Sequence, residues 1–238
     1  MTRYGPMFGP DITFLGIERC DLGEPATFAG ADVVVIGAPF DGGTSHRAGA
    51  RFGPQAIRGT DYLAHDGSRP HLALRVDPLR DLRVRDAGDV EMPPGHIERA
   101  LEALTDAVAT VAASGAIPVV LGGDHSITLA DVTGVARHHG FGRVSVVHFD
   151  AHADTGDQVF GARRSHGTPM RRLVERGHVD PARYVQLGLR GYWPGREVFA
   201  WQAERGIRHH LMSELRDHGV VRLLDDALAA LGPGPVWL

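Results

Sequence analysis

The chain has 238 residues, 43% of them hydrophobic, which is ordinary for a globular protein with a buried core. A net charge of −4, from 29 acidic and 25 basic residues, argues against nucleic acid as a partner. Every basic residue is arginine, so Schiff-base chemistry and a P-loop lysine are excluded. We expect one domain over residues 1–238.

Cysteine use and the N-terminal sequence indicate the compartment. Cys20 is the only cysteine, so an intrachain disulfide or a thiolate metal cluster cannot form, which favours a reducing environment. Prolines and charged residues interrupt residues 1–21, so this stretch lacks the apolar core of a secretory signal. No segment approaches the length of a membrane span. We expect a cytoplasmic protein with no membrane partner.

The first half of the chain starts as an irregular arm rich in glycine and proline. Residues 32–36, an aspartate followed by four β-branched residues, predict the first strand. The glycines of residues 37–45 permit close backbone approach, which makes this loop a candidate for an active site. Pro54 suits the first turn of a helix that begins near Gln55. Residues 82–86 alternate apolar and charged side chains and predict a half-exposed edge strand.

The rest of the chain alternates helices and strands. Apolar residues spaced by three and four predict an amphipathic helix at 96–114. Residues 117–121 predict a short buried strand, and Ser126 is the expected N-cap of helix 127–137. Further strands are predicted at 144–149, 183–187, 207–211 and 235–238, and further helices at 170–176 and 220–231. This alternation predicts an α/β fold, a three-layer α/β/α arrangement with a mainly parallel sheet.

The strand that begins at Val144 runs directly into Asp150, His152 and Asp154. In an extended backbone every second side chain points the same way, so these three residues could converge on one cation. His125 follows the preceding strand, and ligands of parallel sheets bind beyond the carboxyl ends of the strands. Imidazole and carboxylate donors suit Mn²⁺, and two ions could share a carboxylate and acidify a water between them.

Each of these residues also has an ordinary structural role. His125 could cap a helix or fill the core, and Asp150 or Asp154 could cap a turn, but their conjunction at two strand ends favours a metal site. His166 could transfer a proton or could simply be solvated. Phe40 to Gly43 is expected to form a turn. Surface or helix-face positions are expected for His138, His139, His209 and His210 and for the pair Arg171 and Arg172, which could alternatively contact another subunit.

Three motifs resemble those of the ureohydrolases, the arginase and agmatinase superfamily. They are Gly-Gly-Asp-His-Ser at 122–126, Asp-Ala-His-Ala-Asp at 150–154 and His-Gly-Thr-Pro at 166–169. Four longer stretches resemble the agmatinase-like branch more than arginases, and the likeness spans nearly the whole chain. These stretches are residues 35–43, 49–58, 166–172 and 186–191.

The resemblance implies an arginase-like fold, a dinuclear manganese centre and hydrolysis of a guanidino compound to urea and an amine by a metal-bridging hydroxide. It implies that His125, Asp150 and Asp154 hold one Mn²⁺, and that His152 and a bridging Asp150 hold the other. His166 matches the proton-transferring or substrate-orienting histidine. The resemblance also implies a homo-oligomer, a trimer or a hexamer, acting on a small molecule.

The residues Pro235 to Leu238 resemble those that come just before a Ser-x-Asp-x-Asp motif in the family. We therefore expect that a C-terminal segment with the remaining metal-binding aspartates is absent from this chain. Two alternatives stay open. One is an inactive protein that serves as a binding or oligomerisation module, and the other is a related amidine hydrolase such as formiminoglutamase. Arg163 and Arg164 would favour a guanidino acid over agmatine if they faced the site, and otherwise lie in solvent.

Overall fold

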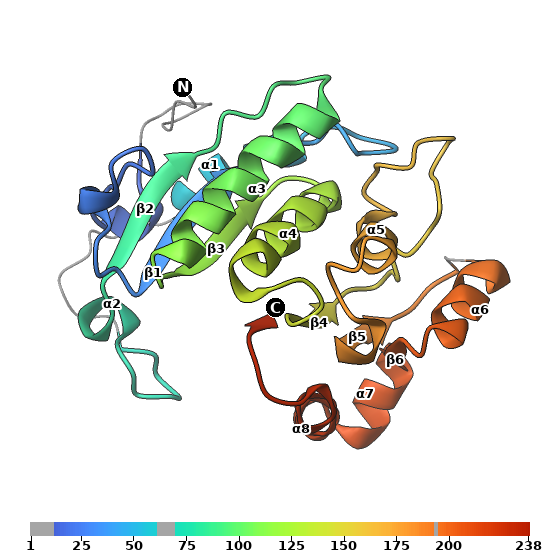
Figure 1. The fold of residues 1–238 in the computed structure, drawn as a ribbon. Helices are drawn as coiled ribbons and strands as arrows, with labels where there is room; N and C mark the ends of the chain where they lie inside the picture. The colour runs from blue at the N-terminus through green and yellow to red at the C-terminus, as the bar shows by residue number, and fades with distance from the viewer. Residues whose placement is uncertain (1–11, 61–69, 193–194) are drawn as a thin grey trace. The chain divides into compact units, whose positions relative to one another are not determined.

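The computed structural model of the chain describes residues 12–60, 70–192 and 195–238. The chain divides into two compact units, Met1–Gly134 and Val135–Leu238, and the boundary falls inside one helix. Each unit is described by itself, with the elements as labelled in Figure 1. The expectation of a single domain over 1–238 stays a prediction.

The first unit is built on a three-stranded parallel sheet in the order β2-β1-β3. Its strands are β1 (Val33–Ala38), β2 (Val84–Asp89) and β3 (Ile117–Gly122). Val33 lies opposite Val84 on one side and Ile117 on the other. The β-branched run of β1 explains its central place, because both of its edges are paired and residues 34–38 are buried.

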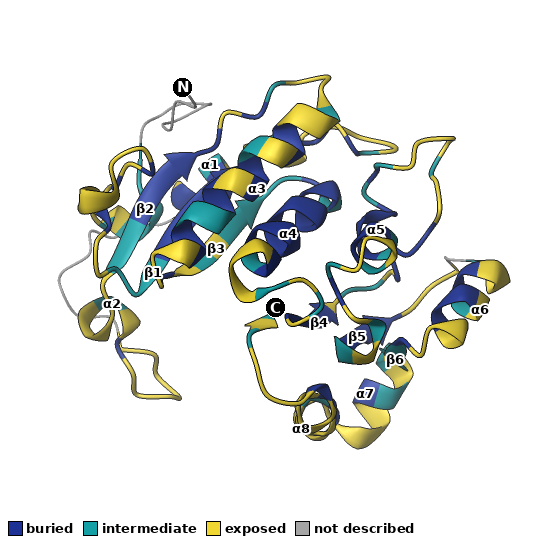
Figure 2. Cartoon of the chain, viewed as in Figure 1, coloured by how far each residue is buried: buried dark blue, intermediate teal, exposed yellow. Residues whose placement is uncertain are grey.

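Helices connect and cover these strands. The helices of the first unit are α1 (Gly53–Arg58), α2 (Pro78–Asp81), α3 (Ile97–Ala113) and α4 (Thr128–His139), whose last turns belong to the second unit. Figure 1 shows α3 in front of the sheet and α1 behind it. The predicted apolar stripe of α3 is confirmed: Leu101, Leu104, Val108 and Val111 are all buried. Figure 2 shows that α4 is buried along most of its length.

Burial corrects one prediction about this sheet and refines another. The strand at 117–121 is not buried: Ile117 and Val119 are 64% and 41% exposed, because β3 pairs with β1 alone among the described strands. The predicted half-exposed edge strand forms: β2 lies at the edge of the sheet, and Val84 and Arg85 are half-buried, whereas residues 86–89 are buried. The segment around Arg19 runs beside it, with the Asp86 amide donating to the Glu18 carbonyl at 3.0 Å. This segment covers part of the β2 edge, which the alternation of apolar and charged residues at 82–86 had predicted to be exposed.

A buried ion cluster joins α1 to β2. The Arg58 guanidinium donates from Nε and Nη2 to the two carboxylate oxygens of Asp86, each at 2.9 Å, and it also pairs with Asp89. Its side chain is 4% exposed, and Asp86 is fully buried. Gly37 has no side chain to obstruct the cluster; a Cβ there would lie 1.8 Å from Asp89 Oδ1. Buried charges of this kind are tolerated because each carboxylate is paired.

The second unit contains a four-stranded parallel sheet in the order β6-β5-β4-β7. Its strands are β4 (Ser145–Phe149), β5 (Tyr184–Leu189), β6 (Arg208–Leu211) and β7 (Val236–Trp237), and its helices are α5 (Pro169–Glu175), α6 (Arg196–Glu204), α7 (Met212–His218) and α8 (Val220–Leu231). One core cluster contains Val147, Val185 and Leu187 from the sheet and Leu215, Leu223, Ala227 and Leu231 from α7 and α8.

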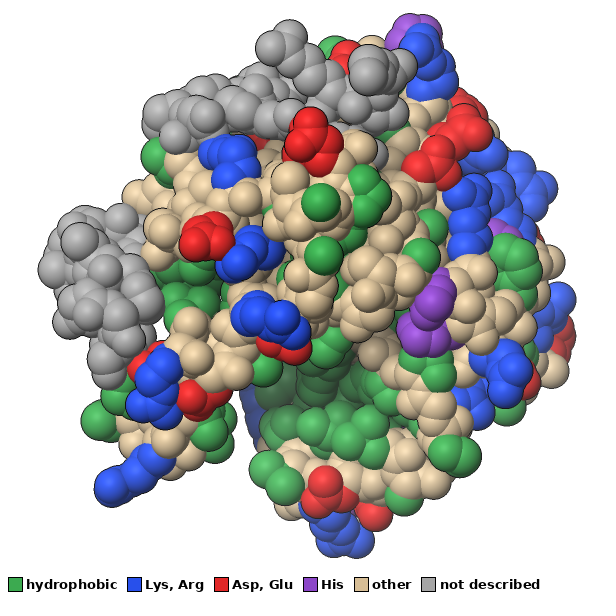
Figure 3. All heavy atoms as spheres, turned by 60° about the vertical axis from the view of Figure 1, so that its left-hand side comes forward, with side chains coloured by type: hydrophobic (Ala, Val, Ile, Leu, Met, Phe, Trp, Pro, Cys, Tyr) green, Lys and Arg blue, Asp and Glu red, His purple; other side chains and the backbone are tan. Residues whose placement is uncertain are grey.

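The α/β fold with parallel strands is confirmed, and the helix at 220–231 and the strand at the C-terminal end form as predicted. Periodicity missed α6 and α7, which are short and have few buried positions. No helix among the described residues is long and apolar enough to cross a bilayer. Arginine and acidic side chains are interspersed on the face drawn in Figure 3, as the scattered charges of the sequence predict.

Candidate metal centre

The loop that follows β4 turns sharply instead of staying extended. Asp150 Oδ1 accepts a hydrogen bond from the His152 amide at 2.8 Å, which closes a tight turn two residues long. Asp154 has a φ of 46°, in the left-handed region that non-glycine residues rarely adopt. His152 has a 55% exposed side chain, whereas Asp154 is 7% exposed. Simple alternation therefore does not describe how these three side chains are arranged, although strained backbone of this kind is typical of functional loops.

His148, which the sequence motifs did not mark as a site residue, contacts Asp150 from β4. Its Nε2 lies 3.2 Å from Asp150 Oδ2, and its side chain is 4% exposed. The signal was available, because residues two apart on a strand share a face, so His148 had to point to the same side as Asp150. The ligand atoms of these two residues are also close enough to hold one ion together.

A chain of buried polar side chains supports this loop from below. Tyr184 and Gln186 on β5 both reach His148 Nδ1, at 3.1 Å and 3.0 Å. Gln202 on α6 bonds to Gln186 Oε1 at 2.7 Å and to Thr155 Oγ1 at 3.0 Å. Burial raises the pKa of Tyr184 well above its usual value, with a smaller contribution from the nearby Asp154 carboxylate. This tyrosine therefore stays a neutral hydroxyl.

His166 lies in a loop that is fastened to the start of α5. The Thr168 hydroxyl accepts from the Ser165 amide at 3.0 Å, and Gly156 N donates to the Gly167 carbonyl at 3.1 Å. His166 is half-buried between these tethers. Its backbone is therefore held in place while the residue stays partly open to solvent, which suits proton exchange.

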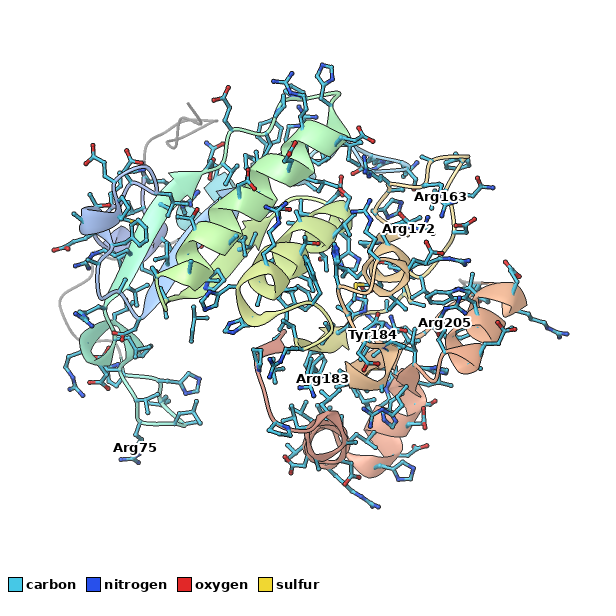
Figure 4. All side chains as sticks on the ribbon, viewed as in Figure 1. Arg75, Arg163, Arg172, Arg183, Tyr184 and Arg205 are labelled. Carbon is cyan, nitrogen blue, oxygen red and sulfur yellow. The ribbon has the colours of Figure 1, made fainter. Side chains whose placement is uncertain are left out.

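The arginines around this loop differ from the solvated helix face that was expected. Arg172 is 4% exposed and donates to Asp157 Oδ1 at 2.7 Å, so the prediction of a solvated position is wrong for Arg172. Arg171 lies over the Trp201 ring, 4.6 Å from its centroid. Arg163 is 62% exposed and lies 3.4 Å from both Asp157 and Glu175. Figure 4 labels Arg163 and Arg172 beside α5. These acids engage Arg163, which supports the solvent-facing alternative for that residue.

In the first unit, His125 opens a short 3-10 helix (His125–Ile127) directly after β3. The N-cap is Asp124 and not Ser126 as predicted: its Oδ1 accepts from the Ser126 amide at 2.7 Å. Its Oδ2 accepts from the Gly43 amide, also at 2.7 Å, which ties the loop after β1 to the loop after β3. Gly123 is required here, because a Cβ would lie 2.1 Å from the Phe40 carbonyl oxygen. His125 thus stands on a rigid strand end.

The glycine-rich loop after β1 forms a turn, as expected. Asp41 is 3% exposed and accepts from the Gly49 amide at 2.7 Å and from the Arg51 side chain. The Arg51 hydrogen bond is the main cause that lowers the pKa of Asp41. The carboxylate of Asp41 is therefore used to hold the loop.

Asp150, His152 and Asp154 come from one loop of the second unit and offer oxygen and nitrogen donors, a set that fits Mn²⁺. Asp150 is well suited to ligation because His148 and the His152 amide already orient its carboxylate. His125 belongs to the first unit. The assignment of these four residues as ligands, and of His166 and Asp150 as catalytic residues, stays a prediction.

Comparison with known proteins identifies the family. The arginase family model matches residues 31–238. Proclavaminate amidinohydrolase of Streptomyces clavuligerus is 38% identical over 209 residues, which cover 88% of this chain and 65% of that protein. Mitochondrial agmatinase of Gallus gallus is 37% identical over 211 residues, 88% of this chain and 60% of that protein. Guanidinopropionase of Pseudomonas aeruginosa is 39% identical over 236 residues, 98% of this chain and 70% of that protein.

Solved structures agree with the sequence comparisons. The structure of proclavaminate amidinohydrolase from Streptomyces clavuligerus has a TM-score of 0.82 at 35% identity and covers 97% of this chain and 73% of its own. Trypanosoma cruzi formiminoglutamase with Mn²⁺ has a TM-score of 0.75 at 34% identity, covering 85% of this chain and 67% of its own. The chain thus spans 60% to 70% of the length of the three curated relatives. It belongs to the arginase family, in the agmatinase-like branch of the ureohydrolases.

Proposed function

We propose that the protein hydrolyses the guanidino group of a small molecule and releases urea and an amine. The observation that carries this proposal is the 39% identity to a guanidinopropionase across 98% of the chain. The name of that relative, like agmatinase and amidinohydrolase, refers to compounds with a guanidino or amidino group. The relatives share this chemistry and differ in the rest of the substrate, so guanidino hydrolysis is the activity common to them.

The metal that we propose is Mn²⁺, two ions per site, held by His125, Asp150, His152 and Asp154. The formiminoglutamase structure with Mn²⁺ supports this metal, as does the mixture of carboxylate and imidazole donors. When bound, the ions would lower the pKa of a water molecule and supply charge that stabilises an intermediate with developing negative charge. Asp150, which has two carboxylate oxygens, is the residue that would contribute to holding both ions.

The chain's own residues would position the substrate and move a proton. The guanidinium carbon is a poor electrophile because its charge is delocalised, and the departing amine needs a proton to leave. The half-buried position of His166 on a tethered loop beside α5 supports it as the residue that brings that proton from solvent. We assign it this role in the proposed reaction.

Formiminoglutamate hydrolysis is a second candidate, supported by the TM-score of 0.75 to a formiminoglutamase. Its reacting group is also an amidine carbon, so the same water attack would apply. A non-catalytic binding or oligomerisation module is the third candidate, and the absence of turnover would distinguish it from the other two. We further propose that the protein is cytoplasmic. We also propose that it is a homo-oligomer, a trimer or a hexamer, and analytical sedimentation would test this oligomeric state.

Urea release with Mn²⁺ tests the proposal. The substrates are agmatine, guanidinopropionate, guanidinobutyrate and formiminoglutamate, the last assayed through formamide release. The assay compares residues 1–238 with a chain extended beyond Leu238 to the length of the relatives. We expect Mn²⁺-dependent urea release from a guanidino substrate, abolished by Asp154→Asn, while His138→Gln on the exposed end of α4 serves as the control. Absence of urea from both chains with every guanidino substrate would reject the proposed function.

A further inference from the structure

In the hydrogen-bonded chain that leads to Asp150, each side chain donates to the next one toward Asp150. The Ala153 backbone carbonyl determines which atoms are the donors. Gln186 Nε2 lies 2.6 Å from the Ala153 carbonyl oxygen. A carbonyl can only accept, so the Gln186 amide nitrogen must face it, and Gln186 Oε1 must be the acceptor at the other end of the amide. Gln202 Nε2, at 2.7 Å from that oxygen, is then its donor. The orientation of both amides follows from Ala153 alone.

The remaining hydrogens are assigned by the same count. The Gln186 amide has two hydrogens, and its two shortest contacts are to Ala153 O and to Tyr184 Oη, both 2.6 Å. Tyr184 Oη therefore accepts from Gln186, and its own hydrogen is free to donate to His148 Nδ1, 3.1 Å away. Tyr184 is fully buried, as are both glutamines, so no solvent competes for these donors.

One tautomer of His148 matches both Tyr184 and Asp150. If Nδ1 accepts from the tyrosine hydroxyl, the ring proton is on Nε2, which faces Asp150 Oδ2 at 3.2 Å. The opposite tautomer would place a bare nitrogen lone pair against a carboxylate oxygen and leave the Tyr184 hydroxyl hydrogen without an acceptor. Since Nε2 carries the proton, it cannot also bind a metal, even though its distance from Asp150 would permit a shared ion.

We propose that His148 is a positioning residue for Asp150. It donates from Nε2 to one carboxylate oxygen, and the chain Gln202, Gln186, Tyr184 holds the imidazole in that tautomer from helix α6 across β5. The same glutamines also hold the Ala153 carbonyl and the Thr155 hydroxyl. The network thereby fixes both ends of the segment that carries the predicted ligands. The inference deepens the proposed function and rests on it for its metal-binding consequence.

The tautomer can be tested on the metal-free protein, whatever the enzyme does. Long-range ¹H–¹⁵N correlation spectra of ¹⁵N-histidine-labelled protein distinguish protonated from bare ring nitrogens, and the His148→Gln variant identifies the His148 signals. We expect a protonated Nε2 and a bare Nδ1 for this residue. A protonated Nδ1 with a bare Nε2 would overturn the inference, even if the protein were an active enzyme.

Titration of Mn²⁺ into metal-free variants tests the positioning role. His148→Gln can place an amide donor near the position of Nε2, whereas His148→Asn reaches only the position of Nδ1 and so cannot reach Asp150. We expect Mn²⁺ affinity to fall about 10- to 100-fold in the asparagine variant and to stay within about threefold of wild type in the glutamine variant. His138→Gln is the matched control on an exposed histidine.

The outcomes separate the two proposals. Equal affinity in the asparagine variant and the wild type would refute the positioning role, and an equal loss in both variants would show that the imidazole acts only through packing or as a ligand. The bound Mn²⁺ electron paramagnetic resonance spectrum should change in the asparagine variant and not in the glutamine variant. If the wild type binds Mn²⁺ but neither it nor the extended chain releases urea, the proposed function fails, and the Mn²⁺ affinities of the two variants still decide the positioning role. If the wild type binds no Mn²⁺, the NMR measurement of the His148 tautomer alone decides whether the inference holds.

Discussion

Replacing Arg58 by methionine should destabilise the first unit strongly, because it removes the cation shared by two buried carboxylates. Arg58 donates two hydrogen bonds to Asp86, one to Asp89 and one to the Gly88 carbonyl. Methionine fills similar volume but donates none. After the change Asp86 keeps the amides of Phe14 and Gly88 as donors, at 2.7 Å and 2.8 Å, while the charge on both acids stays uncompensated.

The magnitude follows from burial. The Asp86 and Asp89 side chains are 0% and 3% exposed, so water cannot replace the lost guanidinium. Breaking a buried ion pair by removing one partner typically costs about 3–5 kcal/mol, and we expect a loss in that range. Removing the charges as well should recover part of it. The triple variant Arg58→Met, Asp86→Asn and Asp89→Asn should therefore be more stable than Arg58→Met alone.

The free energy of unfolding is measured by urea denaturation followed by far-ultraviolet circular dichroism. Tryptophan fluorescence is less suitable, because Trp201 and Trp237 belong to the second unit. Arg80→Met is the matched control, since Arg80 pairs with Asp81 on the surface and its removal should leave the midpoint unchanged. A loss below about 1 kcal/mol for Arg58→Met, or a triple variant no more stable than the single one, would refute the explanation based on buried charge.

Two further predictions concern titratable groups. Cys20 is 5% exposed, and its burial, together with the nearby Asp86 charge, raises its pKa to about 11. At pH 8 only about 0.1% of such a thiol is ionised, so it should react with a disulfide reagent at least tenfold more slowly in the native protein than in urea; equal rates would contradict this. The hydrogen bond from Arg172 lowers the pKa of the Asp157 carboxyl. The ion pair between Asp157 and Arg172 of α5 is therefore present at neutral pH. It is lost as the pH falls below about 4, the usual pKa of aspartate, and through the lowered pKa of Asp157. An acid-stable protease should cut the loop at 156–168 faster as the pH falls through that range, and Asp157→Asn should remove the dependence; a flat profile in the wild type would count against it.

Sequence patterns located most elements because periodicity reports which face of an element is buried. The stripe of α3 and the β-branched run of β1 gave their places directly. The pattern was less informative where a distant segment changes the environment. The segment around Arg19 pairs with the edge of β2, and Asp157 forms a hydrogen bond with the buried Arg172. Neither contact is visible in the periodicity of the sequence.

The sequence by itself determined the fold class, the family and the segment that carries the predicted ligands, because strand periodicity, glycine positions and contiguous motifs are local properties of the chain. Only the tertiary structure decided how that segment is held. His148, Tyr184, Gln186 and Gln202 are separated by up to 54 residues and meet only when α6 and β5 pack beside β4. Hydrogen-bond partners across such separations are set by packing, so the side chains that hold His148 beside Asp150 could be recognised only in the folded chain.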